Sequence, residues 1–405
     1  MNRPSRKNFY ILLIDAVAYA TFCALWDVNT VIPVFLDQID SPSWLVGAVS
    51  SLKQLGFLIP QLFVVGQLYK LNSLGGSIST IMFVDRLQLL IFPLLLLLTA
   101  DRTVLLTVFL ISFAILSFGE GTVVIPWMDL MGRTLRPETR GRFWGSIQVL
   151  GGIATLGAGF IISQLLDSPS LAFPRNFVVI FGIGALIVLP SIILFKTAED
   201  PILPFARGPA GWLNPVRRCL DNRQFVLLLA VQHLSGYDSL AIPYYIIMVR
   251  HRFQWLVGST GTYVLLSIAG GILGGILWGI LSNLGNSKII KLIIFVKVVT
   301  AGIFLTSQLV DSRPALTFLL AAGFTLLGIV TAAWIGFFSC ILNMAAHSER
   351  PFYIALSNAV FFPTAFLPII GGLLREYSGD ITLYIIATAA MTAAFVLSLR
   401  MRDPA

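Results

Sequence analysis

Twelve apolar stretches, each about as long as a membrane-crossing helix, dominate this chain of 405 residues. A helical crossing needs about 20 mostly apolar residues. Hydrophobic residues make up 57% of the sequence and charged residues only 11%, against about 25% charged in soluble domains. A water-soluble protein is therefore excluded. Strands of a membrane barrel alternate apolar and polar residues, which runs such as Leu94–Leu98 do not do. We predict an all-α polytopic membrane protein with spans near 9–34, 43–69, 75–98, 103–130, 141–166, 176–196, 224–248, 256–281, 288–309, 315–342, 352–374 and 380–399.

The lysine and arginine residues between the spans predict the orientation. Cytoplasmic loops carry an excess of these residues. With both termini in the cytoplasm, the inner segments hold eighteen lysines and arginines and the outer segments hold six. The net charge of +8 is then a topology signal and not a sign of a nucleic-acid partner. We expect a multi-pass protein of a bacterial inner membrane with both termini cytoplasmic.

The longest connection divides the spans into two sets of six. Residues 197–223 are rich in proline and glycine and are predicted to form a cytoplasmic linker between bundles at 1–196 and 224–405. The two halves also resemble each other weakly. Asp27 precedes Pro33 in the first span as Asp238 precedes Pro243 in the seventh, and three such matches have offsets of 208–213 residues. This favours a duplicated six-helix unit, which would place a binding site between its halves near mid-membrane.

Two loop motifs are similar to those of the major facilitator superfamily. The family's loop after the second span usually reads Gly-x-Leu-x-Asp-Arg-x-Gly-Arg-Arg. Gly66 and Leu68 match it, but Lys70 stands where the acid belongs. The repeat copy begins at Gly279 and has Asn283 in place of the acid.

The loop after the fourth span carries the second motif. Residues 136–145 resemble the Pro-x-x-x-Arg-Gly-x-x-x-Gly loop common in the family, whereas residues 157–159 lack the proline of its antiporter motif. The resemblance covers essentially the whole chain. It implies two six-helix bundles and transport by alternating access, and it leaves the subfamily and the direction of transport open.

No cofactor or metal site is predicted. The three histidines are scattered along the sequence, and Cys23, Cys219 and Cys340 form no CxxC pair. A Walker loop is also absent from the sequence, which argues against ATP-driven transport.

Nine charged residues fall inside the predicted spans. An ionisable side chain at mid-bilayer costs about 2.5–3.5 kcal/mol on insertion scales, so each is a candidate functional residue. They are Asp15, Asp27, Lys53, Asp85, Arg86, Glu120, Asp129, Asp238 and Lys297.

Matching depths in the membrane suggest two pairs of charged residues in the first half. Asp27 and Lys53 lie equally far from the turn at Asp40, so a structural salt bridge and a functional site are equally supported. Arg86 and Glu120 lie within about 6 Å in depth, and we prefer them as a central functional pair over packing support.

The charges nearer the inner membrane surface have structural interpretations. Asp129 lies close to the arginine-rich loop and is expected to bridge to Arg140 or Arg142, as a cytoplasmic gate or as scaffold. Asp15 is expected to pair with Lys7 or Arg6 by snorkelling.

The second half holds fewer charges. Lys297 is expected to snorkel, with a substrate counter-charge as the alternative. His233 and Tyr237 share a helix face, and His233 is favoured as a packing residue over a proton carrier. Asp238 is the only acid in the second-half spans, and structural and functional roles are equally supported. The eighth span carries glycines at small-xxx-small spacing, which predicts a close-packed seam: Gly270, Gly271, Gly274, Gly275 and Gly279.

These features favour a secondary active transporter of a small organic solute, coupled to protons and acting as a monomer. The coupling candidates are Asp27, Glu120 and Asp238, with Lys53 and Arg86 as partners. Acids outnumber bases six to three in the spans, which favours cationic or amphipathic substrates and therefore efflux.

Two alternatives remain open. The first is a lipid or lysolipid flippase, with an amphipathic path lined by Trp26, Trp127, Trp334, Phe361 and Phe362. The second is a membrane enzyme or sensor, which the scattered positions of the acids disfavour.

Overall fold

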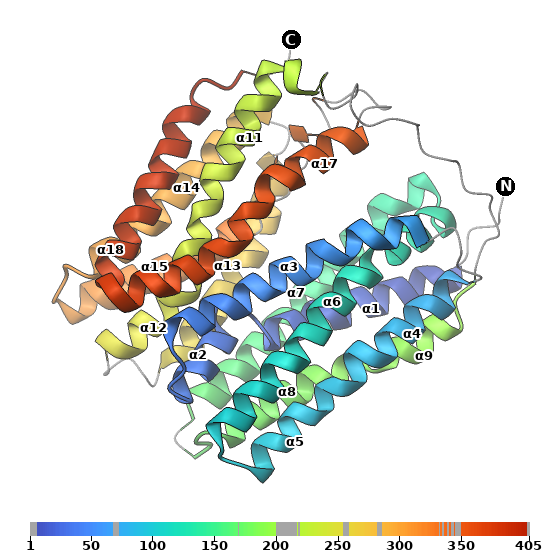
Figure 1. Cartoon of the computed structure of the whole chain (residues 1–405), viewed down its shortest axis with the longest axis horizontal. Helices are drawn as coiled ribbons and strands as arrows, with labels where there is room; N and C mark the ends of the chain where they lie inside the picture. Colours follow the sequence, from blue (N-terminus) through green and yellow to red (C-terminus); the bar gives the residue numbers. More distant parts are fainter. Residues whose placement is uncertain are drawn as a thin grey trace. The chain divides into compact units, whose positions relative to one another are not determined.

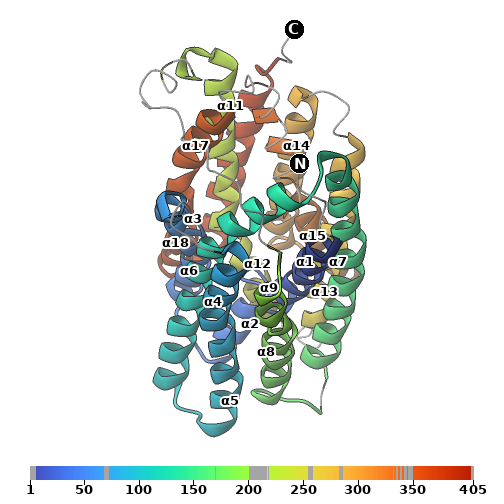
Figure 2. The same ribbon diagram turned by 90° about the vertical axis from the view of Figure 1, so that its right-hand side faces the viewer.

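The computed structural model (Figures 1 and 2) is built of helices over the described residues: 6–67, 73–168, 170–199, 217, 219–253, 259–281, 286–331, 333, 336–337, 340–341, 344 and 350–402. The chain divides into two compact units. The first comprises residues 1–40, 49–207 and 257–261, and the second comprises residues 41–48, 208–256 and 262–405. Most of the predicted linker at 197–223 lies outside the described residues.

Ten stretches of the described residues are long and apolar enough to cross a membrane. One of them, Phe352–Ser398, has 47 residues, more than twice the roughly 20 that one crossing requires. It is broken at Gly379, whose φ of 79° is not helical and suits a residue without a Cβ. The helix α3 (Ser43–Gln67) has 25 residues and is separate from the ten. The all-helical fold is confirmed, and the number of twelve crossings stays a prediction.

The first unit packs its helices in two groups. Helix α1 lies against α7 and α8, and α4 lies against α6 and α9, as Figure 1 shows; Figure 2 shows α5 continuing the direction of α4. Besides α3, the elements are α1 (Arg6–Leu25), α2 (Val31–Gln38), α4 (Leu74–Leu87), η2 (Gln88–Leu90), α5 (Ile91–Leu98), α6 (Arg102–Thr134), α7 (Pro137–Leu166), α8 (Arg175–Val188) and α9 (Pro190–Lys196).

A buried aromatic cluster fixes one end of this unit. Trp26 packs on Phe181 with ring centroids 4.5 Å apart, and its indole N–H donates to the Phe181 carbonyl at 3.2 Å. Phe35, Phe92 and Phe109 belong to the same cluster. Buried aromatic pairs of this kind add about 0.5–1.5 kcal/mol each beyond the area that they bury.

The second unit is built around α14, which packs against α15 and α18 (Figure 1), while α11 packs against α18 and α17. Its elements are α11 (Arg223–Ser235), η3 (Gly236–Leu240), α12 (Ile242–Arg252), α13 (Thr260–Leu281), α14 (Asn286–Ser307), α15 (Arg313–Thr331), α17 (Arg350–Phe361), η6 (Phe362–Phe366) and α18 (Leu367–Ser398).

The predicted glycine seam of the eighth span packs closely at Gly270 and Gly274, whereas a Cβ on Gly279 would meet nothing within 4 Å. A Cβ on Gly270 of α13 would lie 2.0 Å from the Thr325 carbonyl oxygen of α15, and one on Gly274 would lie 2.6 Å from that of Ile329. The helices therefore approach backbone to backbone, which only small residues allow.

The first span of each half is interrupted, where the sequence predicted one continuous helix. Helix α1 ends at Leu25 and α2 begins at Val31. Asp27 lies in this gap, where its Oδ1 accepts hydrogen bonds from the Asn29 N–H at 3.0 Å and the Thr30 hydroxyl at 2.7 Å. Such local bonds offer the backbone an alternative to helical pairing.

In the second half, α11 gives way to the 3₁₀ segment η3, which contains Asp238, before α12 begins. Pro243 lies in the first turn of α12, the position in a helix where proline is tolerated. Further 3₁₀ segments, η2 and η6, interrupt the predicted spans 75–98 and 352–374.

Candidate functional site

An ion pair joins Lys53 of α3 to Glu120 of α6 inside the first unit. The helices meet closely here because glycines flank the acid: a Cβ on Gly121 would lie 2.4 Å from the Gly56 carbonyl oxygen. The α1 residues Tyr19 and Cys23 lie close enough to Glu120 to interact with it electrostatically.

A second ion pair joins Arg86 of α4 to Asp15 of α1. An Arg86 guanidinium nitrogen lies 2.8 Å from Asp15 Oδ1, and it also donates to the Val188 carbonyl at 3.2 Å. The other Asp15 oxygen accepts from the Trp127 indole N–H at 2.9 Å. Both charged side chains are buried, so this three-residue network holds α1, α4 and α6 together.

These two pairs correct the predicted ones. Neither Asp27–Lys53 nor Arg86–Glu120 is formed, and Asp15 does not pair with Lys7 or Arg6. Depth alone does not decide between partners, because rotation about the helix axis selects which neighbour a side chain faces. Consecutive residues point about 100° apart, so Arg86 faces α1 while its neighbour Asp85 packs against Gly119 of α6.

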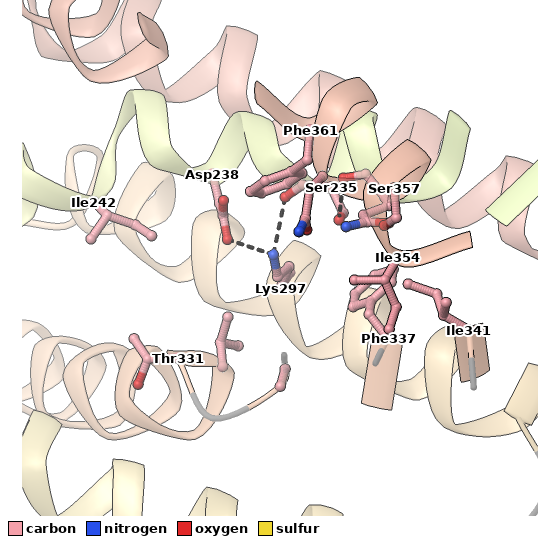
Figure 3. Close-up of a pocket in the computed structure, with 14 residues that line it drawn as sticks. Ser235, Asp238, Ile242, Lys297, Thr331, Phe337, Ile341, Ile354, Ser357 and Phe361 are labelled. Carbon is pink, nitrogen blue, oxygen red and sulfur yellow. Dashed lines mark hydrogen bonds and ion pairs between the residues drawn. The ribbon is translucent and has the colours of Figure 1, made fainter. Parts of the chain in front are cut away.

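A third ion pair lies in the second unit, at the interruption of its first span. Asp238 Oδ2 in η3 is 2.7 Å from the Lys297 ammonium of α14, which also donates to the Ser235 carbonyl at 3.1 Å. Figure 3 shows the two charged groups pointing toward each other. The predicted snorkelling of Lys297 is therefore wrong, because an acid and a backbone carbonyl lie within its reach.

This pair lines a cavity of about 360 Å³ within the second unit. One part of the wall is polar: Ser357 lies beside Gln232 and donates its hydroxyl to the Gln232 amide oxygen at 2.6 Å, and Asn358 and Thr331 add further polar groups. The remaining wall is apolar, as Figure 3 shows in part, and is formed by Ile242, Val330, Ala333, Phe337, Ile341, Ile354 and Phe361.

His233 does not belong to the wall of this cavity. Its Nδ1 lies 3.0 Å from the Val360 carbonyl, so this nitrogen carries a hydrogen. Its ring packs edge-on against Tyr237. Both contacts agree with packing.

The expected bridge from Asp129 to the following loop is not formed. Helix α6 continues to Thr134, so Arg133 lies one turn beyond Asp129 and pairs with it at 2.8 Å. Arg140 instead donates to the Gly132 carbonyl at 2.7 Å and to that of Leu135 at 3.3 Å, which satisfies carbonyls at the end of α6. Arg142 is exposed.

The structural roles of several of these residues were not predicted from the sequence. Asp85 was recognised only as a charge within a span, and Asp15 and Lys297 were expected to snorkel. Gln232 and Ser357 carried no signal that set them apart from other polar residues. In the described residues, no group of three or more His, Cys, Asp or Glu residues is placed to hold a metal ion.

Comparison with known families decides the class of protein. Residues 87–362 match the Major Facilitator Superfamily. The chain belongs to this superfamily. It is therefore an integral, multi-pass membrane transporter and not an enzyme.

Solved structures of other superfamily transporters share its fold. A point mutant of the nucleoside transporter NupG has a TM-score of 0.73 at 14% identity, over 98% of this chain and 100% of that one. A bacterial homologue of the iron transporter ferroportin, in an inward-facing state, has a TM-score of 0.71 at 15% identity, over 97% and 98% of the two chains.

A bacterial homologue of the human lysosomal transporter Spinster has a TM-score of 0.63 at 13% identity, over 99% of the present chain and 98% of the homologue. No curated protein sequence matches the chain. The identities are low, so these likenesses show the superfamily fold alone.

Proposed function

We propose that this protein is a secondary active transporter of a small organic solute, working by alternating access and coupled to protons. The observation that carries the proposal is the Asp238–Lys297 ion pair in the wall of a 360 Å³ cavity, at an interruption of the first helix of the second half. Charged groups at mid-membrane are costly and mark solute or ion sites, and interrupted helices at such depth accompany binding sites in transporters.

The cavity wall has a polar part and an apolar part, which supports an amphipathic or cationic solute. Asp238 offers a carboxylate to a cation, Gln232 and Ser357 offer hydrogen bonds, and Phe361 offers an apolar surface. Such a solute competes with Lys297 for Asp238. Efflux is the direction we propose, because toxic and foreign compounds of this chemistry are commonly removed from cells.

Proton coupling requires carboxyl groups whose charge can change. Glu120 and Asp238 are each paired with a lysine, so protonation of either acid would release its partner. Asp27 remains a candidate by its position in the first helix gap. Lys53 and Arg86 are the predicted partners in the first half, and His233 is the least supported candidate because its Nδ1 is engaged.

A ligand-stabilisation screen on the purified full-length protein tests the proposal. Ethidium and tetraphenylphosphonium serve as cationic probes, each at two pH values, followed by ethidium transport in proteoliposomes under a pH gradient. Asp238→Asn should abolish both signals, whereas Asp311→Asn, in an exposed loop, should leave them unchanged. Equal binding by both variants would contradict the solute site.

A lipid or lysolipid flippase is the second candidate. An apolar groove of about 600 Å³ in the first unit supports it, lined by α1, α7 and α8 residues that include Leu13, Val17 and Ile161. Of the aromatic residues predicted for a lipid path, Phe361 lines the cavity of the second unit, Phe362 begins η6, Trp26 and Trp127 are buried, and Trp334 lies outside the described residues. Translocation of a fluorescent lysolipid in liposomes distinguishes this function from solute transport.

We also propose a monomer in a bacterial inner membrane, with both termini cytoplasmic and no nucleic-acid partner. The charge asymmetry of eighteen inner to six outer basic residues supports this orientation. Reporter fusions at each terminus test it, and an external signal from either would contradict it.

A further inference from the structure

Among the buried side-chain atoms of the first unit without a hydrogen-bond partner, three are carboxyl or amide oxygens near the contact between α4 and α6. They are Asp85 Oδ1, Gln88 Oε1 and Glu120 Oε1. Asp85 is 3% exposed and Glu120 is 8% exposed. A buried acceptor without a donor costs about 1–3 kcal/mol, and more when it is charged. Three such oxygens in one region therefore indicate that the site binds a hydrogen-bearing or cationic species.

The three side chains lie around one contact between α4 and α6. A Cβ on Gly119 would lie 2.4 Å from Asp85 Cβ and 2.5 Å from Asp85 Oδ2, and the Asp85 and Glu120 carboxyl groups are close enough to interact electrostatically. The Gln88 amide nitrogen connects the same two helices. It donates to the Asp85 carbonyl of α4 at 2.9 Å and to the Ser112 carbonyl of α6 at 3.0 Å. This leaves only its oxygen free.

The nearby bases are already engaged. Arg86 is committed to Asp15 and Lys53 to Glu120, so Asp85 has no counter-charge of its own. The titratable groups that interact with Asp85 are Arg86 on its own helix, Asp15 on α1 and Glu120 on α6. Glu120 in turn interacts with Tyr19 and Cys23 on α1 and with Lys53 on α3. The neighbouring helices α8 and α9 carry one ionisable residue each, Arg175 at the start of α8 and Lys196 at the end of α9.

Charge balance identifies the missing species. Three carboxyl groups, those of Asp15, Asp85 and Glu120, face two bases. An ionised carboxylate without a partner is strongly disfavoured in a dry interior, where it is neutralised instead. In the described residues, no three His, Cys, Asp or Glu side chains are grouped to hold a metal ion, whereas a proton needs only one or two oxygens. One proton brings the group to neutrality.

We propose that Asp85 binds a proton and exchanges it with Glu120, making this pair the proton-binding centre of the first half. The proposal rests on the proton coupling proposed above. In the first state, the Asp85 O–H donates to the Gln88 amide oxygen. In the second state, the Asp85 O–H bond has broken, a new O–H bond has formed on Glu120, and Asp85 is a carboxylate beside Arg86.

The exchange changes the ion pair of Glu120. A neutral Glu120 no longer balances the Lys53 ammonium, so Lys53 is released. Lys53 is also the most accessible member of the group, with a side chain 23% exposed against 7% for Glu120. Glu120 is more accessible than Asp85, so a proton enters on the Glu120 carboxylate and passes from there to Asp85.

Infrared spectroscopy of the purified full-length protein in lipid tests proton binding without any solute. Ordinary aspartates and glutamates ionise near pH 4, so a protonated-carboxyl C=O band that persists at neutral pH and shifts in D₂O reports a buried acid. We expect this band in the wild type and in Asp311→Asn, and its loss in Asp85→Asn, which mimics the protonated side chain. Absence of the band from the wild type, or its survival in Asp85→Asn, would overturn the proposal.

Two further variants separate the parts of the proposal. Gln88→Leu should keep the band but move its frequency, because the acceptor of the Asp85 O–H is gone, and an unmoved band would overturn the role of Gln88. Glu120→Gln should lose the band near neutral pH, because two carboxyl groups then face two bases and the group is neutral without the extra proton. A band that survives in Glu120→Gln would overturn the charge balance.

A transport assay tests the coupling role independently of the spectrum. With ethidium as the probe, Asp85→Asn should retain exchange between equal pools in proteoliposomes and lose accumulation driven by a pH gradient. Gradient-driven accumulation at the wild-type level would overturn the coupling role. If wild-type protein moves no ethidium, the proposed function fails for this probe, while the infrared band still decides whether Asp85 binds a proton.

Discussion

Arg86 and Lys297 occupy corresponding positions in the two halves of the chain. They are 211 residues apart, the same separation that relates Asp27 to Asp238. Each is the basic member of a buried ion pair between the first and third spans of its half. Their acidic partners do not correspond, because Lys297 pairs with Asp238 whereas Arg86 pairs with Asp15. Asp27, the counterpart of Asp238, accepts hydrogen bonds from Asn29 and Thr30 in its own turn instead.

The Arg86–Asp15 pair should be essential to the stability of the first unit. Removing one member of a buried pair leaves the other charge uncompensated, which costs about 3–5 kcal/mol. We expect Arg86→Met to lower the thermal unfolding midpoint strongly and the double variant Asp15→Asn/Arg86→Met to recover part of the loss. A double variant as unstable as the sum of both single variants would contradict an interaction between them.

The α13–α15 seam should tolerate no added methyl group. A Cβ on Gly328 would lie 1.9 Å from the Ser267 carbonyl oxygen, and such overpacking costs about 1–3 kcal/mol. Gly328→Ala is therefore expected to lower the unfolding midpoint. Gly302→Ala is the matched control, because a Cβ there meets nothing within 4 Å, and a helical alanine is favoured over glycine by about 0.5–1 kcal/mol.

Asp129 should couple to Arg133 and not to Arg140. Helix pairs of this spacing contribute about 0.2–0.5 kcal/mol. Double-mutant cycles on unfolding, with Asp129→Asn combined with Arg133→Gln or with Arg140→Gln, measure the two interactions. A larger coupling to Arg140 would restore the bridge expected from the sequence.

Removing Lys297 should change the preference of the cavity for charge. Without its partner, Asp238 is free to bind a cation, so Lys297→Met is expected to bind tetraphenylphosphonium at least about tenfold more tightly, or about 1.4 kcal/mol. Titration calorimetry on the purified variant measures this affinity. Asp238→Asn should abolish binding of the same probe, and weaker binding by Lys297→Met would argue against competition for Asp238.

The sequence was sufficient for the fold class and the family, because both depend on long-range patterns of hydropathy and on loop motifs. It also identified, among the described residues, the four buried charged side chains as charges within spans: Asp15, Asp85, Arg86 and Glu120. Partners could not be derived in the same way. Counting residues from a turn gives the depth of Arg86, but its rotation about the helix axis decides between Asp15 and Glu120.

The helix interruptions show a second limit of the sequence. Asp27 and Pro33 match Asp238 and Pro243 in the sequence, yet the pattern gave only similarity between halves, not the broken helices that it encodes. The orphaned oxygen of Asp85 had no sequence signal at all, since a lack of donors is a property of all the neighbours together.

The corresponding positions of Arg86 and Lys297 hold chemically different charges. An arginine side chain stays cationic in a protein, whereas a lysine ammonium can give up its proton. The charge of Arg86 in the Arg86–Asp15 pair is therefore permanent. The Lys297–Asp238 pair becomes neutral if one proton moves from the Lys297 ammonium to the Asp238 carboxylate. The two halves are consequently not interchangeable: a chimera built from two copies of the first would keep a buried ion pair in each bundle but would lose the one at Lys297 that can be neutralised.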